Sequence, residues 1–207
     1  MNAPVLILAS ASPRRADLLR QLGFDFHVAP SATAEIHSSD LSAGEVAQLN
    51  ACRKARAVSK KFPDAVTLGV DTIVALGSTL FGKPSDLAEA ERMVSALMGR
   101  THQVVTGVCL IHLRGHRRKM FCERTDVTFR TLTPAQIRDY HARVNPLDKA
   151  GAYGIQEHRG ILVESISGSF SNVAGLPMER LLPELAAFGI LQPAARFQNV
   201  GDDVRSL

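Results

Sequence analysis

The chain has 207 residues, of which 45% are hydrophobic and 21% are charged, a composition typical of a globular protein. It is long enough to bury a core, and no apolar run reaches the length that spans a bilayer. The formal net charge is +4, and much of the excess lies in one hexamer, Arg-Gly-His-Arg-Arg-Lys, at positions 114–119. Because this hexamer falls between two strand-like runs and the chain has no Trp and two Tyr, we expect a solvated hairpin tip. The alternative is a nucleic-acid or membrane contact.

The first ten residues do not resemble a secretion signal, because they lack both a charged head and a cleavage site. The three cysteines, Cys52, Cys109 and Cys122, are odd in number and have no C-x-x-C spacing. Cys109 and Cys122 fall in strand-like runs, where buried thiols are common. We therefore expect a reduced protein that works in the cytoplasm, with neither nucleic acid nor a membrane as its partner.

The spacing of apolar residues predicts strands that alternate with helices. In chain order we expect a strand at 5–9, a helix at 13–22, strands at 24–28 and 66–76 on either side of a helix at 45–61, a helix at 86–98, hairpin strands at 104–113 and 120–129, a helix at 133–141, a strand at 161–166 and a helix at 177–188. Residues 30–44 read as a loop, and the stretch from Gln192 onward is expected to be loose. This order predicts an α/β fold with a mixed sheet.

The first candidate site follows the first strand, where residues 10–15 read Ser-Ala-Ser-Pro-Arg-Arg. Ser12 suits an N-cap and a proline suits the first helical position, so a helix should begin there. Backbone N–H groups at a helix start attract anions, and Ser10, Arg14 and Arg15 add donors that suit phosphate oxygens. The alternative is a surface helix with two solvated arginines, and no G-x-x-x-x-G-K-[ST] loop is present.

The second candidate is a carboxylate inside an otherwise apolar strand. Asp71, followed by Thr72, interrupts the run of apolar residues at 66–76. A buried carboxylate is costly unless it is paired, binds a metal or lies at the end of a strand. Asp71 is therefore expected to be a ligand for a hard cation such as Mg²⁺ or a general base in a cleft. The alternative is a turn aspartate in a hairpin.

Further candidates are two isolated lysines and one loop. Lys83 lies in the rigid turn Phe-Gly-Lys-Pro, and Lys54 lies among small residues of a predicted helix, although either alone could be a solvated surface lysine. Residues 147–156 are rich in Gly and Ala, which suggests that backbone approaches a ligand closely. Gln156 at its end offers both a donor and an acceptor for the edge of a base, and the alternative is a tight loop. Neither a zinc site nor a serine nucleophile is predicted.

Together these segments resemble the Maf family of nucleotide pyrophosphatases. The matching segments follow the family's order and lie at 10–15, 54–55, 69–74, 82–84, 99–102, 148–156 and 175–177. The first of them and the stretch Lys-Ala-Gly-Ala-Tyr-Gly-Ile-Gln at 149–156 are the most specific. The resemblance implies an α/β fold with a mixed, twisted sheet flanked by helices. It also implies that residues 1–207 form a single domain with two lobes around a central cleft.

The resemblance implies a reaction as well, namely hydrolysis of a nucleoside triphosphate to the monophosphate and pyrophosphate with Mg²⁺ or Mn²⁺. Members that carry Ala-Gly-Ala-Tyr-Gly-Ile-Gln act on dTTP and UTP, so these are the implied substrates, with clearance of non-standard or excess nucleotides as the implied role. A homodimer is usual in the family. The alternatives are a pyrophosphatase for 7-methyl-GTP or another modified nucleotide and a nucleotide-binding regulator of cell division.

The resemblance finally implies roles for individual residues. Asp71 corresponds to the family's proton acceptor, and Glu35 corresponds to an acidic residue of the metal and water site, so the implied metal ligands are Asp71 and Glu35. The family usually has glycines where Glu157 and Arg159 stand, so the loop beside the base is expected to differ in shape. The implied residues for substrate choice are Arg14, Thr72 and Gln156, and those for phosphate contact are Ser10, Arg15, Lys54 and Lys83.

Overall fold

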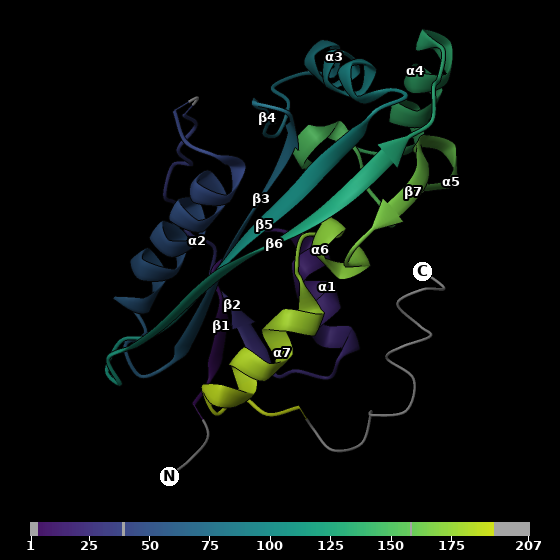
Figure 1. Ribbon diagram of the computed structural model, residues 1–207. Helices are drawn as coiled ribbons and strands as arrows, with labels where there is room; N and C mark the ends of the chain where they lie inside the picture. The colour runs from purple at the N-terminus through teal and green to yellow at the C-terminus, as the bar shows by residue number, and fades with distance from the viewer. Residues whose placement is uncertain (1–3, 39, 158, 193–207) are drawn as a thin grey trace.

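The computed structural model describes residues 4–38, 40–157 and 159–192 (Figure 1). The sequence predicts a loose tail from Gln192 onward, and the part of it beyond Gln192 lies outside the described residues. The strands are β1 (Leu6–Leu8), β2 (Phe26–Val28), β3 (Val66–Leu76), β4 (Thr79–Phe81), β5 (Thr101–His112), β6 (Arg117–Phe129) and β7 (Val163–Ser167). The helices are α1 (Pro13–Gln21), α2 (Ala43–Ser59), α3 (Leu87–Leu97), α4 (Pro134–Arg143), the 3-10 helix η1 (Ala150–Ala152), α5 (Arg159–Leu162), α6 (Phe170–Val173) and α7 (Met178–Ala187).

The strands form one mixed, seven-stranded sheet in the order β2-β1-β3-β5-β6-β7, with β4 paired to β3. The pairs β1 with β2 and β1 with β3 are parallel, whereas the pairs β3 with β4, β3 with β5, β5 with β6 and β6 with β7 are antiparallel. Figure 1 shows the long strands β3, β5 and β6 crossing the molecule with helices on both sides. The predicted α/β fold with a mixed sheet flanked by helices is therefore confirmed. The division into one domain with two lobes stays a prediction.

Successive side chains along β3 point to opposite faces of the sheet. Val66, Leu68, Val70 and Val74 belong to the main core, to which α1, α3, α4 and α7 contribute their apolar sides. The side chain of Ile73 points to the other face, where it packs with residues of α2. Asp71 has the same parity as Ile73, so it too faces α2. The carboxylate of Asp71, in the middle of a buried strand, thus faces helix α2.

Helix α2 lies unusually close to the sheet because two strand positions have no side chain. A Cβ on Gly69 of β3 would lie 2.2 Å from the carbonyl oxygen of Ala51, and one on Gly107 of β5 would lie 2.3 Å from the carbonyl carbon of Ala47. On the helix, Ala47, Ala51 and Ala55 recur every four residues and are fully buried. This small-residue contact fixes how near the α2 backbone lies to the centre of β3.

The edge of β3 that faces β1 has a gap in its strand pairing. Residues 66–68 pair with β1 and residues 74–76 pair with β4, and no described strand pairs with residues 69–73 on that edge. The chain passes from β1 through α1 to β2 on one side and then through α2 to β3 on the other side of β1. Open α/β sheets bind ligands at such a reversal of strand order, outside the carboxyl ends of the strands. The topology therefore places a site between the end of β1 and residues 69–73.

The predicted elements differ from the observed ones mainly at short segments. Helix α2 begins at Ala43 instead of Glu45, because Ser42 caps it and Glu45 closes a capping box. Four short elements, β4, η1, α5 and α6, were not predicted, since a run of three or four residues gives little periodic signal unless, as at β1 and β2, apolar neighbours extend it. The predicted strand at 161–166 divides into the end of α5 and β7.

The cations of the basic hairpin tip make contacts within the chain. Arg114 pairs with Asp64, Lys119 Nζ lies 2.8 Å from Glu184 Oε1, and Arg117 lies over the ring of Phe188. The predicted solvated hairpin tip is confirmed, since β5 and β6 form a hairpin and residues 113–119 at its end are exposed. In the described ranges, no helix is both long enough and apolar enough to cross a membrane.

Gly69→Ala tests the close approach of α2. The new methyl group would collide with the backbone of α2, so we expect the free energy of unfolding to fall by about 2 to 3 kcal/mol. Urea unfolding followed by circular dichroism would measure the loss. The matched control is Gly160→Ala, where a Cβ meets no atom within 4 Å. An unchanged unfolding midpoint for Gly69→Ala would show that α2 does not depend on this contact.

Candidate active site

A cleft of about 360 Å³ opens at the gap in the edge of β3. One wall is the end of β1 and the start of α1, and the floor is the stretch of β3 from Asp71 to Val74. The other walls are residues 31–35, residues 148–155 and residues 173–175. The predicted site residues Ser10, Arg14, Arg15, Glu35, Lys54, Asp71, Thr72 and Lys83 all line this cleft, and Gln156 directly follows the lining residue Ile155.

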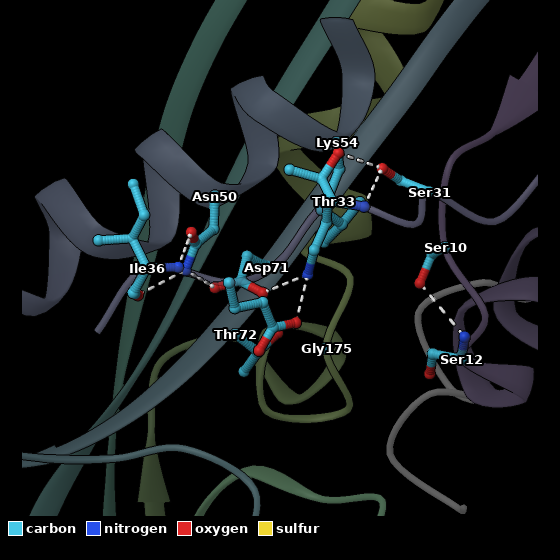
Figure 2. A network of polar contacts seen from close by, with 12 residues as sticks. Ser10, Ser12, Ser31, Thr33, Ile36, Asn50, Lys54, Asp71, Thr72 and Gly175 are labelled. Carbon is cyan, nitrogen blue, oxygen red and sulfur yellow. Dashed lines mark hydrogen bonds and ion pairs between the residues drawn. The ribbon is translucent and has the colours of Figure 1, made fainter. Parts of the chain in front are cut away.

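The centre of the cleft is a lysine held between two carboxylates. Lys54 Nζ donates to Asp71 Oδ1 and to Glu35 Oε1, each at 2.6 Å. Lys54 and Asp71 are nearly buried, with 12% and 5% of their side chains exposed, whereas Glu35 is 29% exposed. Figure 2 shows Lys54 reaching from α2 to Asp71 on β3. The close approach of α2 at Gly69 places this ammonium directly over the strand.

Asn50 is a member of the site that sequence reasoning missed. Its Nδ2 donates to Asp71 Oδ2 at 3.1 Å and to the carbonyl oxygen of Ile36 at 3.1 Å, and its Oδ1 accepts from the Ile36 N–H at 2.8 Å (Figure 2). Asn50 is 1% exposed. It therefore fixes both the carboxylate and the loop that carries Glu35. The available signal was its position one helical turn before Lys54, which puts both side chains on one face of α2.

The two carboxyl groups differ in their affinity for a proton. Burial raises the pKa of Asp71 above its ordinary value, and the charge of Glu35 adds to the rise while Lys54 opposes it. Burial also acts to raise the pKa of Glu35, but the hydrogen bond and charge of Lys54, together with the charge of Lys83, lower it below its ordinary value. Asp71 is thus the stronger base of the pair.

The buried side chain of Arg15 connects separate segments of the chain at the floor of the cleft. Its Nε donates to the carbonyl oxygen of Gly175 at 2.9 Å, its Nη1 to Ser10 Oγ at 2.9 Å and to the carbonyl oxygen of Val70 at 3.2 Å, and its Nη2 to Thr72 Oγ1 at 2.9 Å. Burial lowers the pKa of Arg15 to about 10. Val70 lies in the stretch of β3 that has no strand partner on the edge facing β1, so Arg15 satisfies a carbonyl that the gap leaves open. Its predicted role in phosphate contact stays a prediction.

Arg14 crosses the mouth of the cleft to the opposite wall. It donates to Asp148 Oδ2 at 3.1 Å and to the Asp148 carbonyl oxygen at 3.2 Å. The other carboxylate oxygen of Asp148 accepts from Lys149 Nζ at 2.9 Å, and Glu157 Oε1 lies 3.3 Å from the same Nζ. Glu157, which stands where the resembled family has glycine, is thus drawn into the charge network of this wall.

Lys83 and the first turn of α1 line the cleft and offer hydrogen-bond donors to a ligand. Lys83 is exposed, and the described residues include no ion-pair partner for it within 4 Å. The predicted N-cap Ser12 holds the N-cap position of α1, yet its side chain makes no capping hydrogen bond. Helices α2, α3 and α4 are capped by Ser42, Asp86 and Thr133. The first turn of α1 therefore offers backbone donors and positive dipole to an anion.

Gln156 and Thr72 occupy different settings. Thr72 Oγ1 accepts from Arg15 and lies 3.1 Å from Thr106 Oγ1, so it is fixed in the floor. Gln156 is half-buried and lies beside, but not in, the lining of the cleft. The structure thus brings together all the predicted site residues except Gln156, which lies at the border.

The donor set fits a cation that arrives with its ligand. The described residues contain no group of three or more His, Cys, Asp or Glu side chains that could hold a metal ion. Asp71 and Glu35 supply carboxylates separated by a single ammonium. Mg²⁺ is typically bound by one or two carboxylates together with phosphate oxygens and waters, so these residues suit an ion shared with a phosphate.

The cleft combines a buried base, several cations and an uncapped helix N-terminus at a reversal of strand order. These features define a protein that binds a phosphorylated ligand and can activate water beside it. The comparison with known families agrees with this class. The model of the family "Maf-like protein" matches residues 5–188, and the chain belongs to that family. The family predicted from the motifs is therefore confirmed.

Named relatives align over most of this chain. A dTTP/UTP pyrophosphatase of Symbiobacterium thermophilum is 48% identical over 89% of this chain and 94% of its own. Those of Moorella thermoacetica and Deinococcus radiodurans are each 45% identical, over 89% and 91% of this chain and 95% of their own. A solved HAM1 protein of Coxiella burnetii is more distant, with 13% identity over 61% of this chain and 73% of its own and a TM-score of 0.41.

Lys54→Met tests the electrostatics of the centre. Lys54 lowers the pKa of both Asp71 and Glu35, so its removal should move both pKa values upward. Titration of the carboxyl carbons by ¹³C NMR would measure this. In the control Lys83→Met, the pKa of Glu35 should rise while that of Asp71 moves less, because Lys83 acts mainly on Glu35. An Asp71 pKa that fell or stayed constant in Lys54→Met would contradict the arrangement.

Proposed function

We propose that this protein hydrolyses dTTP and UTP to the nucleoside monophosphate and pyrophosphate, and so clears non-standard or excess nucleotides. The relatives named dTTP/UTP pyrophosphatase support the substrates, because they align over about nine-tenths of the chain. The observation that carries the reaction is Asp71, a buried carboxylate of raised pKa that lies in a cleft opposite several cations.

Asp71 is the proposed proton acceptor. A water beside it attacks the α-phosphorus in line with the departing pyrophosphate and passes a proton to the carboxylate as the new P–O bond forms. The hydrogen bonds from Lys54 and Asn50 orient the carboxylate, so little reorganisation is needed during attack. Because burial raises the pKa of Asp71, its carboxylate binds a proton more strongly than an exposed one.

The cations of the cleft hold the triphosphate. The open first turn of α1, together with Arg14 and Lys83, lines the cleft, and in this proposal these groups bind phosphate oxygens and stabilise the charge that develops on pyrophosphate. Lys54 lies between the two carboxylates at the centre of the cleft. Asp71 and Glu35 are the residues that would hold Mg²⁺ or Mn²⁺, and such an ion, when bound, neutralises phosphate charge and lowers the pKa of a bound water.

The surroundings of the enzyme are also proposed. We place it in the cytoplasm as a homodimer that binds no nucleic acid. The free thiols of Cys52, Cys109 and Cys122 support a reducing compartment. The contacts that hold the basic hairpin tip to its own chain support the absence of nucleic-acid binding. Light scattering after gel filtration would give the mass of the assembly.

A substrate panel tests the function. Pyrophosphate release would be measured with dTTP, UTP, CTP, GTP, ATP and 7-methyl-GTP, each with Mg²⁺ or Mn²⁺. We expect the highest kcat/KM for dTTP and UTP. Release from 7-methyl-GTP alone would contradict the pyrimidine substrates. No release from any nucleotide would favour a nucleotide-binding regulator of cell division.

Asp71→Asn tests the proton acceptor. The amide keeps the size of the side chain and an oxygen that accepts from Lys54, so the variant should fold. It should lose about 10²- to 10⁴-fold in kcat, because an amide cannot accept the proton of water. Thermal unfolding would be measured beside the dTTP assay. A variant that kept more than about a tenth of its turnover, a barrier change below about 1.4 kcal/mol, would refute the assignment.

A further inference from the structure

One wall of the cleft is built from an unusual stretch of backbone. Residues 150–155 contribute Ala150, Tyr153, Gly154 and Ile155 to the lining. Two consecutive residues of this stretch, Gly151 and Ala152, have left-handed backbone with φ of +68° and +63°. This region is unfavourable for alanine and persists only where the surroundings hold it. The shape of the wall therefore depends on contacts made behind it.

Those contacts come from side chains that do not line the cleft. Tyr140 of α4 is 1% exposed, and its hydroxyl accepts from the Gly154 N–H at 3.0 Å and donates to the Gly154 carbonyl oxygen at 3.4 Å. His141, the next residue, donates through Nε2 to the carbonyl oxygen of Ala152 at 3.2 Å. One helix thus fixes the backbone of the wall at two points.

The hydroxyl of Tyr140 is suited to this double contact. Gly154 turns both of its backbone polar groups toward the same atom, which must accept from one and donate to the other. Burial raises the pKa of Tyr140 to about 12, so the hydroxyl keeps its proton at neutral pH. A Cβ on Gly154 would lie 2.7 Å from the side chain of Lys149, so the backbone at Gly154 is also packed tightly against that side chain.

The remaining lining indicates what this wall contacts. Asp148 and Lys149 carry the charges at the start of this wall and the other lining charges come from other walls and from the floor, whereas residues 150–155 present mainly apolar side chains and backbone. A nucleobase with its flat apolar faces matches such a surface better than a phosphate does. Gln156, the residue that the family resemblance links to substrate choice, comes two positions after Gly154.

We propose that Tyr140 is a positioning residue for nucleoside recognition, which holds Gly154 so that Tyr153 and Ile155 face the base and Gln156 reaches its edge. The inference rests on the proposed pyrimidine nucleotide substrates and deepens them. Tyr140 does not line the cleft, and both of its hydrogen bonds go to Gly154 instead of Asp71. Its loss should therefore change which nucleotide is bound more than how fast a bound nucleotide is cleaved.

Tyr140→Phe is the test, since it keeps the buried ring and removes the hydroxyl. We expect KM for dTTP and UTP to rise about tenfold with kcat nearly retained, and the kcat/KM for GTP and ATP to change little. The preference for pyrimidine over purine would thus fall about tenfold. Steady-state kinetics on all four nucleotides would be combined with thermal unfolding.

The matched control is Ile137→Val, which removes one buried methylene from the same helix and touches no hydrogen bond of the wall. It should lower thermal stability and leave the nucleotide preference as in the wild type. A Tyr140→Phe variant that loses stability but keeps the wild-type preference would overturn the inference alone. A wild-type chain without any preference for dTTP and UTP would overturn the proposed substrates and the inference with them.

Discussion

The structure depends on the contact between α2 and the two glycines of the sheet. Gly69 and Gly107 let the α2 backbone lie close to β3 and β5, so the ammonium of Lys54 reaches Asp71 at 2.6 Å. A buried carboxylate without such a partner would be costly to maintain, and a longer distance would leave it unpaired. The packing of small residues therefore determines the electrostatic pairing of Lys54 with Asp71. The positions of Asn50 and Glu35 follow from the same contact.

The sheet supplies the second half of the site. The reversal of strand order between β1 and β3 leaves one stretch of β3 without a strand partner on the edge that faces β1, and Arg15 partly satisfies that edge through the carbonyl oxygen of Val70. The same arginine joins the end of β1 to the turn at Gly175. The floor of the cleft is thus held by a cation that belongs to the protein, whereas Lys83 and the uncapped start of α1 remain open to a ligand.

The parts of the fold and site that could be predicted from sequence are those with a local signal. The polar interruption at Asp71 and the Ser-Pro-Arg-Arg helix start were visible in the chain, and both now line one cleft. Asn50 and Tyr140 were missed because each looks like an ordinary helical residue until the packing of its helix is known. The burial of Arg15 could not be predicted either, since its four acceptors come from four separate positions in the chain.

The gap in the edge of β3 has a consequence for solubility. Unpaired strand edges are templates on which another chain can add a strand and aggregate. Here β1 and β4 cover both ends of the same edge, so the open stretch of residues 69–73 is too short and too enclosed for a foreign strand to pair with it. This gap can therefore expose backbone and a carboxylate of a central strand to a small ligand while it stays closed to strand addition by another chain.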